Sequence, residues 1–256
     1  MIGRRFCLKL TNYICIVIFL FCFGILNAQE IVTDRPDQTE SAAIVPKAKL
    51  QIESGFAYEV SEDDYGKYNS ISAPSTLFRY GLFDFLELRF VHQYNNLKMR
   101  SEQEKLDICG FSDLEFGIKL AFIKSDYIDL ALVSHYAAPT GTDGFGYEKG
   151  ASINKIAVSH SLSDDISLGY NIGYDYFGQG KGDLNYSVVF GYSITDKLGI
   201  FIETYGDFVE LKEHSINYDT GFTYLIEDNF QVDFSFGTGI DNKMNFISFG
   251  FGWLIK

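Results

Sequence analysis

Charged residues of this chain recur at alternate positions in segments whose other positions are aromatic or aliphatic. In residues 166–176, Ile, Leu and Tyr occupy the even positions, and Ser, Gly, Asn and Asp occupy the odd ones. A strand places successive side chains on opposite faces, so such a segment has one apolar and one polar face. On the polar phase of segments like this stand Glu53, Arg79, Glu87, Arg89, Asp113, Glu115, Lys119, Asp129, Asp175, Glu203, Asp219 and Asp233.

This set of charges suits ion attraction rather than covalent chemistry. Nine of the twelve are acids, and a lumen with that balance disfavours anions while it admits cations and neutral solutes. The same residues could instead pair with one another and hold the structure, because buried polar groups must be satisfied whatever the function. Arg89 and Lys119, amid Glu87, Asp113 and Glu115, have the composition of such a network.

A nucleophile beside a base would be the alternative chemistry. The chain has four histidines, His92, His135, His160 and His214. Ser134 and Ser159 each precede a histidine, but neighbours on a strand point to opposite faces. A cross-strand pairing of His135 with Ser159 or His160 stays open, and with it a lipid-modifying enzyme. We expect no enzyme, no metal site and no cofactor.

Long strands must position these residues. The alternation returns in residues 184–194, 230–236 and 247–255, and strands of ten or more residues with an aromatic face suit a wall between lipid and a polar lumen. Short turns are expected at 82–85, 123–126, 163–165, 195–197 and 227–229, and longer connections at 60–70, 95–107, 139–150, 178–182, 207–214 and 241–245. The prediction is an all-β fold: a transmembrane, up-and-down antiparallel β-barrel of about twelve strands over residues 49–256.

A soluble β-sandwich also alternates and is the main rival fold. The strand length, the aromatic residues near strand ends and the aromatic last strand favour the barrel. A lipocalin-like soluble barrel is disfavoured because the small-residue face cannot fill a dry core.

Residues 1–28 have the pattern of a cleaved signal peptide: Arg4, Arg5 and Lys9 precede an apolar run that ends at Leu26. An uncleaved anchor and a lipoprotein fit less well, because the run is short and large residues precede Cys22. Removal of this segment changes the net charge from −13 to −16 and leaves Cys109 as the single cysteine. Such acidity argues against nucleic acid as a partner.

Residues 29–48 have no period and are rich in charge. Pro36 stands among Asp34, Arg35, Asp37 and Glu40, and Pro46 follows them. A disordered periplasmic tail and a plug inside the lumen are both compatible with this composition. The alternation of charge sign favours the plug, in which these residues would pair with inward charges.

Several stretches resemble a family of bacterial outer-membrane proteins assigned as transporters of the phenol meta-pathway type. They are TDRPDQTESAAIVPKAKLQIESGFAYE, FRYGLFDFLELRF, FSDLEFGIKLAF, APTG, NIGYDY and QVDFSFGTGI. The resemblance covers residues 31–256 and is most specific at TDRPDQTES. It departs at Ala48, where the family pattern has glycine after VPK. The resemblance implies a barrel with a transport role and does not name a substrate.

The function expected is therefore a channel for passive passage of small solutes across the outer membrane of a Gram-negative cell. The family resemblance points to hydrophobic or aromatic solutes, whereas the charges favour neutral or cationic solutes over carboxylates. Expected partners are outer-membrane lipid, lipopolysaccharide and the solute, with the protein a monomer. A lipid-modifying enzyme and a purely structural barrel are the alternatives.

Overall fold

The computed structural model describes residues 31–102 and 104–255 of the chain. The expected signal peptide, with Cys7, Cys15 and Cys22, lies outside the described residues. Within these ranges no helix has the length and hydropathy needed to cross a bilayer.

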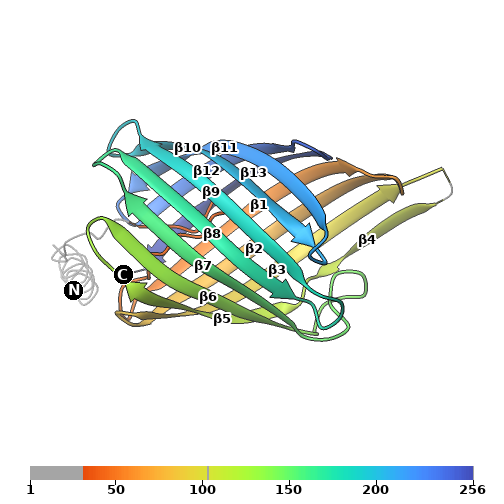
Figure 1. Cartoon of the computed structure of the whole chain (residues 1–256), viewed down its shortest axis with the longest axis horizontal. Coiled ribbons are helices and arrows are strands. Elements are labelled where there is room, and N and C mark those ends of the chain that lie inside the picture. The colour runs from red at the N-terminus through yellow and green to blue at the C-terminus, as the bar shows by residue number, and fades with distance from the viewer. Residues whose placement is uncertain (1–30, 103, 256) are drawn as a thin grey trace, which may run out of the picture.

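Thirteen antiparallel strands of the described residues form one sheet that closes on itself (Figure 1). β1 pairs with both β2 and β13, so the first and last strands complete the ring. A closed single sheet excludes the sandwich and confirms the predicted barrel. The strands are β1 (Leu50–Glu62), β2 (Lys67–Phe83), β3 (Leu86–Arg100), β4 (Lys105–Phe111), β5 (Leu114–Ile123), β6 (Ile128–Ala138), β7 (Ala151–Ser161), β8 (Ile166–Tyr176), β9 (Asp183–Ser193), β10 (Leu198–Val209), β11 (Glu213–Glu227), β12 (Phe230–Gly239) and β13 (Lys243–Ile255).

The barrel wall has twelve strand positions, called staves below, and the thirteenth strand arises because one stave is interrupted. β3 pairs with β4 through Tyr94–Arg100 and with β5 through Leu86–Val91, so β4 and β5 are two pieces of one stave, broken at Ser112 and Asp113. The barrel therefore has the twelve staves predicted. The hairpin of β3 and β4 projects beyond the other strands at the end with the longer loops (Figure 1).

Four of the six connections expected to be long are shorter in the structure. Strand pairing extends to Glu62 and Lys67 in one hairpin, to Arg100 and Lys105 in the next, and to Val209 and Glu213 in a third. In the fourth connection, pairing resumes at Lys243, the first residue of β13. Polar side chains in these hairpins suggested loops, but beyond the apolar band a strand can be polar on both faces. The connection 139–150 remains long, as expected.

The two faces of the barrel have opposite chemistry. Phe116, Phe122 and Phe249 are among the exposed aromatic side chains of the outer face. Rings from neighbouring staves lie against each other, as in Phe90 and Phe116, whose ring centroids are 5.3 Å apart. The largest fully buried side chains are mostly polar, with Arg79 and Lys119 at 0% exposure. This is the reverse of a soluble protein and matches a wall between lipid and a polar interior.

Ala48 makes the turn that leads into β1 with a φ of 63°. This left-handed conformation favours glycine, because a side chain there crowds the backbone. Alanine at position 48 therefore keeps the same turn, although glycine would adopt this conformation with less crowding.

Candidate functional site

Residues 31–47 run through the interior of the barrel before β1 begins (Figure 1). The backbone N–H of Asp34 donates to Glu53 of β1 at 2.9 Å, and that of Gln38 donates to Glu203 of β10 at 2.6 Å. Side chains of β2, β3, β5, β7, β8, β9, β12 and β13 also bond to this inner segment. The barrel wall thus satisfies backbone groups that no secondary structure pairs.

Asp34 lies among three bases on one side of the lumen. Lys119 Nζ lies 2.9 and 2.8 Å from its two carboxylate oxygens, Arg89 Nη1 lies 2.8 Å from Oδ2, and Arg79 Nη1 lies 3.4 Å from Oδ2. Ser41, on the same segment, donates its N–H and hydroxyl to Oδ1. Burial alone would raise the pKa of Asp34, but the three positive charges outweigh it and hold that pKa well below its usual range.

Glu40 extends this network to a fourth base. Arg89 Nη2 lies 2.9 Å and Lys155 Nζ 3.3 Å from its carboxylate. Burial opposes ionisation here too, yet Arg89 and Lys155 lower the pKa of Glu40 to about 2. The network is balanced, because four bases face four acids: Arg79, Arg89, Lys119 and Lys155 against Asp34, Glu40, Glu53 and Glu87. Two of these acids belong to the inner segment, so the wall alone has an excess of bases in this network.

Arg35 points to the opposite wall. Its Nη2 donates to Asp233 Oδ1 and to Ser248 Oγ, both at 3.0 Å. The guanidinium lies flat on Gly55 and Gly250, which face each other across β1 and β13; a Cβ on either glycine would come within 2.6 Å of it. Glycine at these two positions is therefore what admits the arginine.

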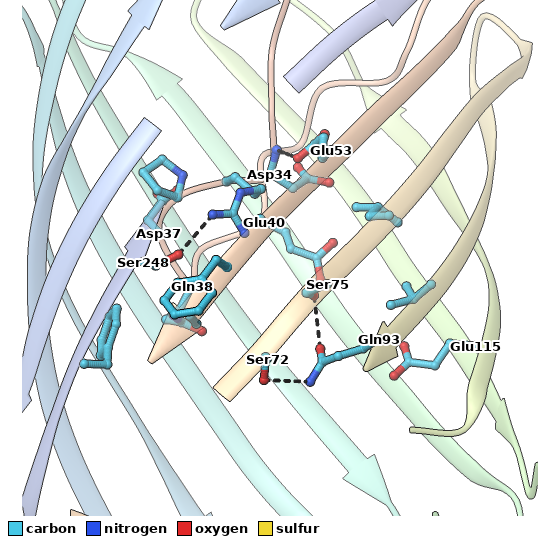
Figure 2. Close-up of a pocket in the computed structure, with 18 of the residues that line it drawn as sticks. Asp34, Asp37, Gln38, Glu40, Glu53, Ser72, Ser75, Gln93, Glu115 and Ser248 are labelled. Carbon is cyan, nitrogen blue, oxygen red and sulfur yellow. Dashed lines mark hydrogen bonds between the residues drawn. The ribbon is translucent and has the colours of Figure 1, made fainter. Parts of the chain in front are cut away.

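A third side of the lumen is acidic. Glu203, which accepts the Gln38 N–H, also accepts the hydroxyl of Thr39, and its partner across the strand pair is Asp219. Burial, and next the charge of Glu203, raise the pKa of Asp37 well above its usual range. The inner segment thus has Asp34 among bases and Asp37 among acids, three residues apart. Figure 2 shows where Asp34 and Asp37 lie on the segment.

Not all residues with the inward phase join these contacts. Asp113, at the stave break, accepts the backbone N–H groups of Thr140, Gly141 and Tyr147 and so fastens the 139–150 loop. Asp129 accepts the N–H of Ser125 in a turn. The alternation along the strand correctly predicts that these side chains face inward, but it does not predict their height along the barrel axis. That height depends on the register between neighbouring strands.

The histidines make contacts that leave no serine beside them. His135 Nε2 lies 2.8 Å from Arg89 Nε, and its Nδ1 lies 3.0 Å from Glu115. His160 stacks on Tyr170, and His214 on Tyr186. Among the described residues no hydrogen bond joins a histidine to a serine, and no group of three or more His, Cys, Asp or Glu could hold a metal ion.

Two cavities flank the inner segment. One of about 700 Å³ faces the end with the longer loops, and one of about 400 Å³ faces the end with the short turns. Both are lined by Arg35, Pro36 and Asp37, and no other residue is shared between them. These three residues therefore lie where the two cavities meet, and Figure 2 shows Asp34, Asp37 and Gln38 of the same segment inside the barrel.

The larger cavity, called the outer cavity below, has an apolar side that the sequence argument missed. Above the charged floor, inward side chains from five staves line it: Leu77, Val91, Ile153, Tyr205, Met244 and Phe246. Each shares its phase with an inward polar residue, as Leu77 does with Arg79. The phase was therefore a sufficient signal for them, as it is for Tyr205, which shares the phase of Glu203.

Comparison with known proteins identifies a family and relatives of the same fold. A family model described as "Putative MetA-pathway of phenol degradation" matches residues 33–254. No curated protein sequence matches the chain.

Solved structures share the fold at low sequence identity. An outer membrane channel from Pseudomonas putida F1 superposes with a TM-score of 0.75 at 12% identity, covering 88% of this chain and 100% of that one. The KdgM porin in complex with disordered oligogalacturonate gives 0.54 at 9%, covering 80% and 99%. The translocator domain of the autotransporter NalP from Neisseria meningitidis gives 0.54 at 10%, covering 82% and 90%.

Proposed function

This chain belongs to the family described as the "Putative MetA-pathway of phenol degradation", and we propose that it forms an outer-membrane channel for small solutes that residues 31–47 close. The observation that carries the proposal is the pair of cavities that share Arg35, Pro36 and Asp37 in their linings. Movement of these three residues would join the cavities into a path along the barrel axis. The structurally similar channel from Pseudomonas putida F1 supports the same function.

The outer cavity suits a small amphipathic solute of neutral or positive charge. A volume of about 700 Å³ lies in the range of small-molecule sites, roughly 300 to 1,000 Å³. Leu77, Val91 and Phe246 offer an apolar side, while Glu59 and Glu115 line the same space. Aromatic compounds, which the family resemblance suggests, fit the apolar side, and the acids disfavour carboxylates.

The setting proposed is the outer membrane, reached through a cleaved signal peptide at residues 1–28. The exposed aromatic face would contact lipid and lipopolysaccharide, and the protein would act as a monomer. We expect no enzymatic activity, since His135 is bonded to Arg89 and Glu115 rather than to a nucleophile.

Planar-bilayer recording of the mature protein and of a variant lacking residues 31–40 tests the closure. We expect several-fold higher single-channel conductance in the deletion variant, with Arg35→Ala intermediate because it removes only the bonds to Asp233 and Ser248. Heat-modifiable mobility in SDS and β-sheet circular dichroism confirm that each barrel has formed. A formed barrel without conductance in any variant would indicate a structural protein.

Solute preference is tested on the deletion variant. In a KCl gradient the reversal potential should indicate preference for cations. 2-Phenylethylamine should block the current better than phenylacetate, which has the same ring with the opposite charge, and Phe246→Ser should weaken that block. Preference for chloride or for phenylacetate would contradict the proposed lumen. Phospholipid hydrolysis in proteoliposomes would favour the enzyme instead.

A further inference from the structure

Asp219 is a buried carboxylate for which the described residues provide no hydrogen-bond donor. The residue is 0% exposed, and neither of its carboxylate oxygens has a donor in reach. Its register partner on β12 is Gly237, which has no side chain, and its partner on β10 is Glu203, a second buried carboxyl group. An unsatisfied buried carboxylate costs several kcal/mol, so its ionised form is not stable here without another partner.

The charged and titratable groups around Asp219 offer no free base. Glu203 and Tyr205 come from β10 and Asp37 comes from the inner segment, whereas the register partner on β12 is Gly237; Asp34 and Arg35 are the next charged residues of the inner segment. Arg35 is bonded to Asp233, and Asp34 is held by Lys119, Arg89 and Arg79. The bases of this lumen are therefore engaged elsewhere, in contrast to the network around Asp34.

Two carboxyl groups that face each other with no base between them are joined directly when one of them is protonated and donates to the other. Glu203 already accepts the Gln38 N–H and the Thr39 hydroxyl, and these bonds favour its ionised form. Asp219 is thus the better place for the proton, from which it can donate to Glu203. Among the described residues no group of three or more His, Cys, Asp or Glu could hold a metal ion, and a proton needs only the two carboxyl groups present.

We propose that Glu203 and Asp219 form a proton-binding site in the barrel wall, with Asp37 as the third member on the inner segment, and that its proton holds residues 36–39 in place. The inference rests on the proposed function, because it concerns the residues where the two cavities meet. Only proton transfer is involved: Asp219 gives up its proton to water in the lumen and becomes a carboxylate.

Loss of the proton would act on Asp37, the member of the group that no strand holds. Glu203 and Asp219 are held by their strands, whereas Asp37 lies in a segment without regular structure. Like charges in a poorly hydrated lumen repel strongly, so ionisation of Asp219 pushes Asp37 away and weakens the closure. The channel is then closed at acidic and neutral pH and opens at alkaline pH.

Asp219→Asn separates this mechanism from a merely structural role. Its amide can donate to Glu203 as the protonated acid does, but it does not titrate. In bilayer recordings, the open probability of the unaltered channel should rise roughly tenfold or more from about pH 6 to about pH 10, and that of Asp219→Asn less than about twofold. Asp64→Asn, which removes an exposed acid outside the lumen, should behave as the unaltered protein.

An infrared titration gives a second readout that does not need conductance. The folded protein should show protonated carboxyl bands at neutral pH that disappear on alkalinisation, and Asp219→Asn should lack the component that belongs to Asp219. Absence of that component, or an unchanged pH dependence in Asp219→Asn, would overturn the site. If the component is present but the variant lacking residues 31–40 does not conduct, the proton site stands and the channel function fails.

Discussion

Replacing Asp34 or Asp37 by asparagine makes the same chemical change in two opposite environments. Asp34→Asn removes the charge that compensates Lys119, Arg89 and Arg79, whereas Asp37→Asn removes a carboxyl group whose ionised form burial and the charge of Glu203 disfavour. Asparagine keeps the size of the side chain, so differences in packing do not confuse the comparison. We expect Asp34→Asn to loosen the inner segment and Asp37→Asn to leave it in place or tighten it.

The magnitude follows from the contacts of Asp34. Removing one partner of a buried ion pair costs about 3 to 5 kcal/mol, because the remaining charge is left without compensation. In the displaced state of the segment, water hydrates the three bases, so most of this cost is felt only in the closed state. At 1.36 kcal/mol for each tenfold change, the displaced population should rise about 10² to 10³-fold.

Cysteine labelling measures this population directly. Val45 is 2% exposed and packs with Ile31 and Leu254, so a cysteine placed there should react with a polar maleimide only when the segment leaves. The background needs Cys109→Ser, because Cys109 is exposed. Labelling should be much faster with Asp34→Asn than with Asp37→Asn. Equal rates in the two variants, or the reverse order, would refute the assignment of opposite environments.

Three further predictions follow from single contacts. The pKa of Glu40 in the fold is about 2, below the ordinary value of about 4.5, so the ionised side chain stabilises the folded protein above about pH 4.5 and this contribution is lost as the pH falls toward 2. Acid unfolding curves of the protein and of Glu40→Gln should therefore converge in that window. Parallel curves would contradict this assignment. Arg79→Met should lower the free energy of unfolding by about 3 to 5 kcal/mol, since Glu53 and Glu87 lose their shared partner; Lys98→Met, exposed on β3, is the control, and similar losses in both would argue against a buried network. Gly250→Ala should displace the Arg35 guanidinium and raise conductance toward that of Arg35→Ala, while an unchanged conductance would show that the arginine does not close the path.

The barrel could be predicted because its determinants are local and repetitive. Each strand must be apolar toward lipid and small or polar toward the lumen. Apolar and polar residues therefore alternate with a period of two in strand segments such as 166–176. The number of hairpin connections could be predicted from the sequence, but their lengths could not. The polar residues of 95–107 resemble a loop, although most of them pair in β3 and β4. A stave break at Ser112 leaves no mark in the alternation.

The candidate site was predictable only in part, for a different reason. Phase alone puts Arg79 and Asp219 on the same inner face, yet one lies among acids and the other has no donor at all. Height along the axis and neighbours across the ladder come from the register, which sums the shear of all staves and cannot be read from one strand.

By itself the sequence determined the barrel, the inward or outward face of each strand residue and the charged character of residues 29–48, because these follow from composition and a period of two. Only the tertiary structure decided which inward charge each residue of that segment meets. Asp34 and Asp37 look alike in the chain, and the closed barrel places bases around the first and carboxyl groups around the second. The difference is a matter of long-range contacts in a poorly hydrated space, where a neighbour a few ångströms away outweighs the residue's own type.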